Sequence, residues 1–405
     1  MYRRKLFEKL IQHLPKKEFS IITGPRQSGK TTLIRQMEEY CRSMDLPALM
    51  LNLENKSILA DLSDHPFNLL KFLPPADRKI CVFIDEVQVH PDPSNFLKLL
   101  YDEHADKIKI IATGSSAFYL DQRFRDSMAG RKRLFHLMTC SFDEYLALSG
   151  KPELANELER LEQNKEMKSA KIEYIKQEWE NYLIFGGYPA VIAESAREEK
   201  IERLNEIRDA FVHRDIQDAG VANEAAFYQL FRILASQTGK LLNMNELAAT
   251  LRIKHDTVQH YLSVLQKCFH IGLVKPFYKN LRKELVKMPK VYFFDNGMRN
   301  ALLNNFNYFQ DRTDRGELWE NYVFKMLAEK HGTEMVHFWR TTGGNEVDFV
   351  LPYLQNPKAI EVKLNEAAFK PTKYRTFRDS YPDIPLEFNC LDPVTEYSFY
   401  RNNTM

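Results

Sequence analysis

The fold of the amino-terminal part of the chain is decided by one stretch, Gly24-Pro25-Arg26-Gln27-Ser28-Gly29-Lys30-Thr31. It matches the pattern G-x-x-x-x-G-K-[ST], a glycine-rich loop between a strand and a helix. The apolar residues 19–23 before it predict a short buried strand, and residues 32–37 after it predict a helix. Because the motif stands in this context, it predicts a phosphate-binding loop rather than an ordinary glycine turn.

The residue types of this loop suit a nucleoside triphosphate and its metal ion. Glycines let the backbone approach phosphate oxygens, and the N–H groups of the loop and of the helix N-terminus attract negative charge. Lys30 is expected to contact the β- and γ-phosphates, and the Thr31 hydroxyl to ligate Mg²⁺. The predicted nucleotide-binding residues are Gly24, Pro25, Arg26, Gln27, Ser28, Gly29, Lys30, Thr31 and Thr32.

An acidic pair follows the apolar strand that is predicted at residues 79–84. A strand that is apolar on both faces belongs in the middle of a parallel sheet, and ligands of such sheets bind at the carboxyl ends of the strands. Asp85 is therefore expected to hold Mg²⁺, and Glu86 to orient and deprotonate the attacking water. The alternative, an acidic turn after a core strand, is less favoured because the phosphate loop occurs in the same chain.

Composition fits a chain that folds into two to four domains. Its 405 residues are 44% hydrophobic, enough to fill buried cores, and it lacks an apolar run of the ~20 residues that a membrane span needs. The basic amino terminus is not followed by an apolar segment, so we expect no secretory signal. The five cysteines are scattered without a C-x-x-C pair, which indicates neither zinc nor a disulfide framework and favours the cytoplasm.

Further strands at 48–53, 107–113 and 133–138 alternate with helices, so we expect a doubly wound parallel sheet. Four motifs of this region resemble a large prokaryotic family of AAA-type ATPases, close to the archaeal ATPases and the signal-transducing ATPases with numerous domains. The motifs are Gly-Pro-Arg-Gln-x-Gly-Lys-Thr-Thr, Phe-Ile-Asp-Glu-Val-Gln, Ala-Thr-Gly-Ser-Ser and Ala-Gly-Arg-x-x-x-Phe. The resemblance covers nearly the whole chain and implies ATP and Mg²⁺ as ligands, and a carboxy-terminal domain of unknown function.

The resemblance also implies roles for residues outside the loop. Thr113 or Ser115 would be the sensor that contacts the γ-phosphate or the attacking water, although a serine here is equally suited to cap a helix. Arg131, in a basic turn, would reach a phosphate of its own subunit or of a neighbour in a ring or other oligomer. A solvated loop charge is the favoured interpretation of Arg131. Arg214 is a further candidate for a nucleotide-sensing arginine.

The middle of the chain has two predicted parts. Residues 151–181 are charge-rich with a helical pattern, and we interpret residues 149–235 as a helical lid over the nucleotide site. Helices at 244–251 and 256–265, separated by a short turn, predict a helix-turn-helix. With strands at 271–274 and 291–294 it would form a winged helix. Between these strands lies a basic stretch with Lys279, Arg282, Lys283, Lys287 and Lys290.

Binding of DNA would place the second helix in the major groove and the basic stretch on phosphates. That helix carries Asp256, Gln259 and His260 and so has little positive charge. Packing within the chain or between subunits is an equally supported role for this winged helix.

A third constellation lies in the last part of the chain. Asp348 on one predicted strand and Glu361-x-Lys363 on the next resemble the PD-(D/E)xK nuclease superfamily, and Glu320 matches the acidic residue often found on its first helix. Glu361 and Lys363 alternate by two, so they lie on one strand face. Two carboxylates could hold Mg²⁺, which would activate water for phosphodiester attack. The favoured alternative is a relic fold whose acidic and basic residues only form ion pairs, and Glu346 has no assigned role.

The predicted organisation has four parts. They are an AAA-type ATPase domain at 1–148, a helical lid at 149–235, a winged helix at 236–295 and a nuclease-like α/β domain at 296–405. The predicted function is Mg²⁺-dependent hydrolysis of ATP, coupled to a carboxy-terminal half that acts on DNA or RNA. The alternative is a nucleotide-gated signalling or scaffold protein with slow turnover and an inactive nuclease-like domain, bound to a protein partner that the sequence does not name.

Overall fold

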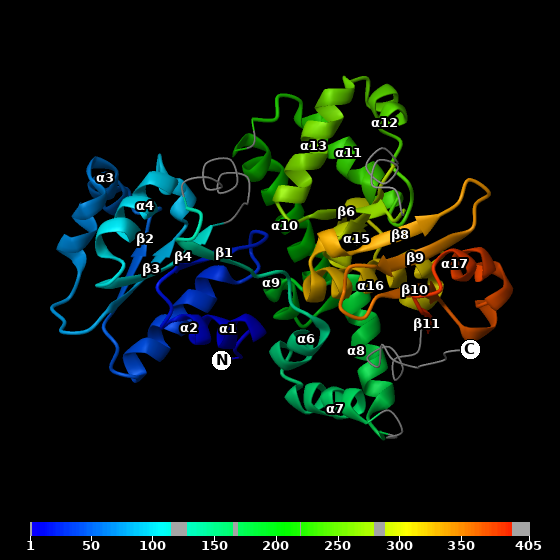
Figure 1. Ribbon diagram of the computed structural model, residues 1–405, viewed down its shortest axis with the longest axis horizontal. Helices are drawn as coiled ribbons and strands as arrows, with labels where there is room; N and C mark the ends of the chain where they lie inside the picture. The colour runs from blue at the N-terminus through cyan, green and yellow to red at the C-terminus, as the bar shows by residue number, and fades with distance from the viewer. Residues whose placement is uncertain (1, 115–127, 165–168, 219, 279–287, 391–405) are drawn as a thin grey trace. The chain divides into compact units, whose positions relative to one another are not determined.

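The chain forms two compact units in the computed structural model (Figure 1). The first unit contains residues 1–138 together with 267–269, and the second contains residues 139–266 and 270–405. The phosphate-loop motif lies in the first unit, and the predicted helix-turn-helix and nuclease-like sequences lie in the second. The described residues are 2–114, 128–164, 169–218, 220–278 and 288–390.

A five-stranded parallel sheet with the order β2-β3-β4-β1-β5 forms the centre of the first unit. The central strands β1, β3 and β4 are buried along their whole length, whereas the edge strands are only partly buried. The strands are β1 (Phe19–Thr23), β2 (Ala48–Asn52), β3 (Ile80–Asp85), β4 (Ile108–Gly114) and β5 (Lys132–His136).

Helices cover both faces of this sheet, because successive strand residues point to opposite sides. Ile22 and Phe83 pack in one apolar cluster with side chains of α1 (Lys5–His13) and α2 (Lys30–Ser43). Their neighbours in sequence pack in the other cluster, with side chains of α3 (Lys56–Asp64) and α4 (Pro93–His104). The predicted doubly wound sheet is confirmed. A 3-10 helix at Pro66–Phe72 follows α3.

The second unit starts with helices. Leu154, Leu158 and Leu161 of α7 are buried, as their spacing predicts. After α8, the turn at Gly187 is fixed by two hydrogen bonds: its N–H donates to Asp295 Oδ2 at 2.9 Å, and its carbonyl accepts from the Cys140 N–H at 2.7 Å. The helices are α6 (Phe142–Leu148), α7 (Pro152–Gln163), α8 (Ile172–Phe185), α9 (Pro189–Ile192), α10 (Arg197–Asp218) and α11 (Glu224–Ser236).

Two helices and two strands follow in the order that the sequence predicts. They are α12 (Met244–Leu251), α13 (His255–Lys267), β6 (Ile271–Pro276) and β7 (Lys290–Phe293), and β6 pairs with β7 in antiparallel fashion. Residues 279–287 of the connection, with Lys279, Arg282, Lys283 and Lys287, lie outside the described residues.

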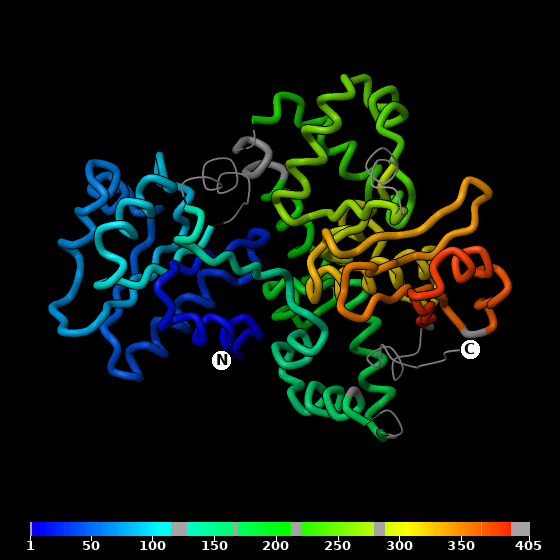
Figure 2. Tube along the Cα trace, viewed as in Figure 1, coloured from blue at the N-terminus to red at the C-terminus, as the bar shows by residue number. Residues whose placement is uncertain are grey.

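The strands β6 and β7 continue directly into the carboxy-terminal sheet. The sheet has the order β11-β10-β9-β8-β6-β7, and β6 pairs in parallel with β8 although some 60 residues separate them (Figure 2). The other strands are β8 (His337–Arg340), β9 (Glu346–Leu351), β10 (Lys358–Lys363) and β11 (Leu386–Cys390). The helices of this part are α15 (Asn296–Leu303), α16 (Arg315–His331), which packs against β7 and β10, and α17 (Arg375–Ser380). Sequences expected in two domains therefore share one sheet.

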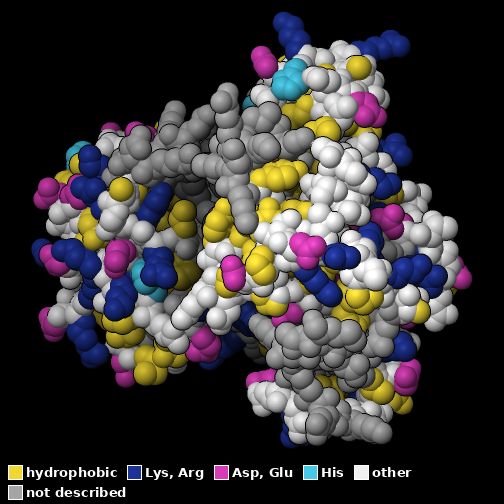
Figure 3. All heavy atoms as spheres, turned by 45° about the vertical axis from the view of Figure 1, so that its right-hand side comes forward, with side chains coloured by type: hydrophobic (Ala, Val, Ile, Leu, Met, Phe, Trp, Pro, Cys, Tyr) yellow, Lys and Arg dark blue, Asp and Glu magenta, His cyan; other side chains and the backbone are white. Residues whose placement is uncertain are grey.

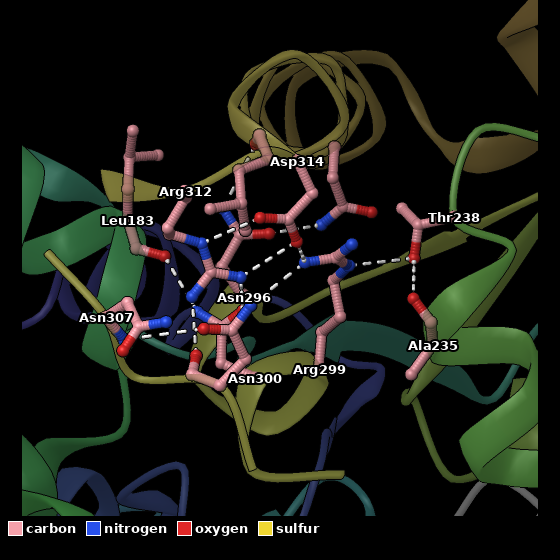
Figure 4. Close-up of polar contacts among 12 residues, drawn as sticks. Leu183, Ala235, Thr238, Asn296, Arg299, Asn300, Asn307, Arg312 and Asp314 are labelled. Atoms are coloured by element: carbon pink, nitrogen blue, oxygen red, sulfur yellow. Dashed lines mark hydrogen bonds and ion pairs between the residues drawn. The ribbon is translucent and has the colours of Figure 1, made fainter. Parts of the chain in front are cut away.

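Two buried arginines hold the start of α16 to α15. Arg299 of α15 donates to Asp314 Oδ2 at 2.8 Å and to Thr238 Oγ1 at 3.0 Å. Arg312 donates to both oxygens of the same carboxylate, at 2.9 and 2.8 Å, and to Asn300 Oδ1 at 2.9 Å. Figure 4 shows both guanidinium groups pointing toward Asp314. Two buried cations thus depend on one carboxylate.

On the face shown in Figure 3, Lys and Arg side chains are interspersed with Asp and Glu, in keeping with the net charge of +2. Within the described ranges, the helices are either too short or too polar to cross a membrane. Cys41, Cys81, Cys140 and Cys268 are buried free thiols.

Candidate functional site

The loop 24–29 joins the end of β1 to the start of α2, as the motif predicts. Gly24 has a φ of 153°, and a Cβ added to it would lie 2.1 Å from the carbonyl oxygen of Leu137. A side chain at this position is therefore excluded by the backbone that follows β5. The Leu137 N–H donates to the Thr23 carbonyl at 2.8 Å, which keeps the two backbones together.

Two polar side chains of the motif, those of Ser28 and Lys30, are buried. The ammonium of Lys30 is buried and donates to the carbonyls of Gly24 and Pro25, at 3.0 and 2.8 Å. Ser28 is fully buried, and its hydroxyl has no hydrogen-bond partner among the residues that the structure describes. A buried polar atom without a partner is costly, so the loop fits a ligand that supplies an acceptor, as a phosphate does. Thr31 is half-buried and Thr32 is exposed.

A residue that the sequence motifs did not indicate supports the loop from outside. Arg4, immediately before α1, donates from Nη1 to the Ser28 carbonyl and from Nη2 to the Met138 carbonyl, both at 2.9 Å. One guanidinium therefore connects the phosphate loop to the backbone after β5. Arginine next to the first helix is common at surfaces, so sequence alone carried no signal for this contact.

The acidic pair and Thr113 lie at the same edge of the sheet as the loop. The register pairs Asn52 with Asp85 across β2 and β3, and Ile22 with Thr113 across β1 and β4. The Thr113 hydroxyl donates to Asp85 Oδ1, and the Glu86 N–H donates to Thr113 Oγ1 at 3.1 Å. Thr113 thus holds both members of the pair. Glu86 has a φ of 56°, and Gln88 donates to its carboxylate.

Arg131 requires a correction. It precedes β5, and its carbonyl accepts from the N–H of Phe19, the first residue of β1. It therefore lies at the amino-terminal edge of the parallel sheet, opposite the loop, and cannot reach a phosphate of its own subunit. Its side chain forms an ion pair with Asp102 at 2.6 Å. Ser115 lies outside the described residues; Arg214 is in α10, and its side chain lies outside the described part.

In the second unit, the four predicted nuclease-like residues come together. Asp348 Oδ2 accepts from the Val362 N–H at 2.9 Å, and Glu361 Oε2 accepts from the Asp348 N–H at 3.3 Å. The Lys363 ammonium contacts Glu361 and lies 3.8 Å from Asp348. Glu320 and Glu346 belong to the same group, so we define the carboxylate cluster as Glu320, Glu346, Asp348 and Glu361.

A second lysine lies in this cluster, and its predicted role is wrong. Lys290 was expected on nucleic-acid phosphates, but its side chain is only 2% exposed. Its ammonium lies 2.6 Å from Glu346, 3.3 Å from Glu320 and 3.9 Å from Asp348. Burial alone would lower the pKa of Lys290, but these carboxylates raise it well above its ordinary value. Lys290 is therefore a buried cation of the cluster.

Tyrosines and burial shape the protonation of the cluster. Tyr374 donates to Glu361 Oε1 at 2.7 Å, and the Tyr292 hydroxyl donates to Glu320. Burial raises the pKa of Glu361 and of Glu320 to about 7, with the Asp348 charge adding to both shifts. Burial alone would raise the pKa of Glu346, but Lys290 and Arg340 lower it. The cluster is thus a buried network of carboxylates, ammonium groups and hydroxyls.

Three family models match different stretches of the chain. Residues 16–146 match the family model that is described as an AAA domain. The match covers most of the first unit, which is therefore similar to AAA domains, and we call it the AAA-type domain. Residues 176–308 and 315–403 each match a model for a domain of unknown function, DUF8612 and DUF4143.

Several curated proteins match this chain over most of its length. An uncharacterized protein of Mycobacterium tuberculosis is 25% identical over 406 residues, which cover 100% of this chain and 82% of the relative. Others occur in Methanocaldococcus jannaschii, 25% identical with 88% and 77% of the two chains covered, and in Haemophilus influenzae, 26% identical with 91% and 86% covered. These likenesses extend through the AAA-type domain and the second unit.

Solved structures match this chain only at low TM-scores. The Aeropyrum pernix ORC2 protein, in ADPNP and ADP complexes, matches with a TM-score of 0.40 and 13% identity, over 66% of this chain and 85% of that chain. The initiator DnaA bound to AMPPCP and single-stranded DNA matches with a TM-score of 0.31 and 15% identity, over 65% and 86% of the chains. At these TM-scores the likenesses carry no argument about the function of this chain.

Proposed function

We propose that the AAA-type domain binds ATP with Mg²⁺ and hydrolyses it. The observation that carries this proposal is the convergence of the loop 24–31, Asp85, Glu86 and Thr113 at one edge of the sheet. The inward-facing Lys30 ammonium and the unpartnered Ser28 hydroxyl fit a phosphate chain. When bound, Mg²⁺ would neutralise part of the phosphate charge.

Each of these residues then has its own role in hydrolysis. Lys30 exchanges its loop carbonyls for phosphate oxygens, and Thr31 and Asp85 would hold Mg²⁺. Glu86 accepts a proton from water as the water oxygen bonds to the γ-phosphorus and the bond from that phosphorus to the bridging oxygen breaks. Thr113 positions both carboxylates through its hydroxyl, which donates to Asp85 and accepts from the Glu86 N–H. ADP and phosphate are the products.

Two variants test this proposal. Lys30→Ala removes the phosphate contact, so we expect nucleotide affinity to fall by about tenfold or more, measured by titration with a fluorescent ATP analogue. Glu86→Gln keeps the shape of the side chain but removes the base. We expect it to bind ATP normally and to lose about 10²–10⁴-fold in turnover. Unchanged affinity in Lys30→Ala, or unchanged turnover in Glu86→Gln, contradicts the proposed site.

A role of Arg131 in a neighbouring subunit remains part of this proposal. Arg131→Ala should lower ATP turnover per subunit without weakening ATP binding, and the difference from wild type should grow with protein concentration. Asp102→Asn removes the partner of Arg131 and leaves the arginine in place, so it serves as the matched control. Equal turnover of wild type and Arg131→Ala at all concentrations contradicts an arginine supplied by a neighbour.

Action on nucleic acid is a second proposal for α13 and the basic stretch that follows β6. The exposed face of α13 carries His255, Asp256, Gln259 and His260, and so mixes charges. Its support is the order of the helices and strands alone. Duplex affinity measured against salt concentration tests it, because phosphate contacts release counterions. A slope near zero contradicts the proposal.

A further inference from the structure

We propose that the ammonium of Lys290 occupies the cation position of the carboxylate cluster, so that a side chain of the chain itself stands where a nuclease would hold a divalent metal ion. The proposal concerns the second unit alone and does not depend on ATP hydrolysis by the first. It favours a nuclease-like fold whose charged residues form ion pairs over a metal-dependent nuclease.

The geometry places Lys290 among three of the four carboxylates of the cluster. Carboxylates from two elements, Glu320 of α16 and Glu346 and Asp348 of β9, lie within 3.9 Å of its Nζ atom. Glu346, whose role the sequence left open, is the closest, at 2.6 Å. The ammonium thus takes the central place between α16 and β9.

The strand fixes this side chain in place. Lys290 begins β7 and pairs with Val274 of β6 and with Leu241 in an isolated bridge. Tyr292 lies two residues further along the strand and so on the same face, and its hydroxyl donates to Glu320. Since Lys290 and Tyr292 bind the same carboxylate from one strand face, the lysine is a built-in member of the cluster.

The remaining carboxylate is also neutralised from within the chain. Lys363 contacts Glu361 and lies 3.8 Å from Asp348, so each acidic side chain of the cluster has an ammonium group beside it. Tyr374 donates to Glu361 Oε1 as well. Each of the four carboxylates therefore has at least one oxygen that already accepts a hydrogen bond from the chain.

A divalent metal does not fit this arrangement. Mg²⁺ requires oxygen ligands at about 2.0–2.1 Å in octahedral geometry, and the charge of Lys290 among those oxygens would repel it. In the part of the chain that the structure describes, no group of three Asp, Glu, His or Cys side chains is arranged to hold a metal ion. The cluster instead joins α16, β7, β9 and β10 through buried ion pairs, and metal-dependent cleavage of nucleic acid is not a function of this site.

Removal of the lysine tests the proposal. Lys290→Met keeps a long apolar side chain but leaves the carboxylates without their central cation. In nucleotide-free full-length protein, we expect it to bind Mn²⁺ about tenfold or more tightly than wild type, measured by the electron paramagnetic resonance signal of free Mn²⁺. The double variant Lys290→Met with Asp348→Asn should lose this gain. Wild type and the single variant Asp348→Asn should bind Mn²⁺ equally.

A matched control uses another buried lysine of the second unit. Lys325 of α16 donates to Thr139 Oγ1, the Cys140 carbonyl and the Tyr182 hydroxyl, and lies 3.7 Å from one carboxylate, that of Glu329. Lys325→Met also removes a buried ammonium but exposes no group of carboxylates. We therefore expect no gain in Mn²⁺ binding in this variant.

If Lys290→Met folds poorly, its unfolding temperature can be measured with and without Mn²⁺. Mn²⁺ should raise its unfolding temperature and leave those of wild type and Lys325→Met unchanged, because only the first variant has a vacant cation position. The proposal is overturned if wild type binds Mn²⁺ at a site that Asp348→Asn removes. It is equally overturned if Lys290→Met gains neither Mn²⁺ binding nor stability in Mn²⁺.

Discussion

At the scale of single residues, the contacts of Arg4 give the AAA-type domain a support that lies outside its motifs. Its guanidinium bonds the carbonyl of Ser28 inside the loop and that of Met138 beyond β5. The loop N–H groups can bind phosphate only if the loop keeps its shape. Arg4 is therefore a positioning residue that acts through the backbone of the loop.

Arg4→Ala should weaken ATP binding about tenfold, because charge-assisted hydrogen bonds contribute about 1.5–3 kcal/mol. Titration with a fluorescent ATP analogue measures the change. Lys9→Ala is the matched control, since it removes a positive charge from the exposed side of the neighbouring helix α1. An equal loss of affinity in both variants would show that net charge, and not the bond to Ser28, determines the effect.

At the scale of elements, the start of α16 depends on Asp314. The side chain lies between Arg299 and Arg312, whose side chains are 3% and 0% exposed (Figure 4). Asp314→Asn would leave two buried guanidinium groups without a counter-charge. We expect the free energy of unfolding to fall by about 3–5 kcal/mol, the usual cost of an uncompensated buried charge.

Urea unfolding measures this change, and Asp311→Asn provides the control. Asp311 lies three residues earlier and is exposed, so its charge contributes little. If the two variants lose the same stability, the buried ion pairs do not hold α15 to α16.

Two glycines, Gly187 and Gly316, differ in how much room the backbone leaves for a side chain. A Cβ on Gly187 would lie 2.2 Å from the Cys140 carbonyl oxygen, whereas one on Gly316, in α16, meets nothing within 4 Å. Gly187→Ala should therefore destabilise the chain, and Gly316→Ala should stabilise it by about 0.5–1 kcal/mol, since alanine favours helix. Thermal unfolding of both variants checks the sign. Stabilisation by Gly187→Ala would mean that the turn has room to move.

The elements also show what sequence could predict. The strands of the first unit follow from apolar runs ending in polar tips, and Asp348, Glu361 and Lys363 come together because their strands pair as their alternation indicates. The sequence predicted Lys290 to contact nucleic-acid phosphates because it follows other basic residues, and this prediction was wrong. The pairing of β6 with β8, a long-range contact, carries β7 into the carboxy-terminal sheet, where Lys290 lies among the carboxylates. A local pattern cannot encode such a contact.

At the scale of the whole molecule, buried histidines and buried glutamates change the stability of the fold in opposite directions as pH changes. Burial lowers the pKa of His13 to about 4, helped by Lys109, and burial lowers the pKa of His270 to about 3. These groups stabilise the fold above pH 6.5 and lose their contribution on acidification. Glu320 and Glu361, with pKa values raised to about 7, stabilise the fold below pH 4.5 and lose their contribution as pH rises through 7.

His270 allows one of these contributions to be isolated. The residue is 5% exposed, and its ring lies 3.8 Å from the ring of Phe211 and 5.4 Å from that of Phe231, centroid to centroid. Its pKa in the fold is below the ordinary value of 6.5, so the unfolded chain binds the proton first. From pH 7 to 4.5 the wild type should lose about 2–3 kcal/mol through this group.

His270→Phe places another apolar ring between these aromatic side chains and removes the titration. Urea unfolding at several pH values should show a shallower loss of stability on the acid side than in wild type. His255→Gln, a change at an exposed position of α13, should leave the wild-type slope intact. If the free energy of unfolding of His270→Phe falls with pH as steeply as that of wild type, His270 is protonated in the folded chain. The acid loss of stability would then come from other buried groups.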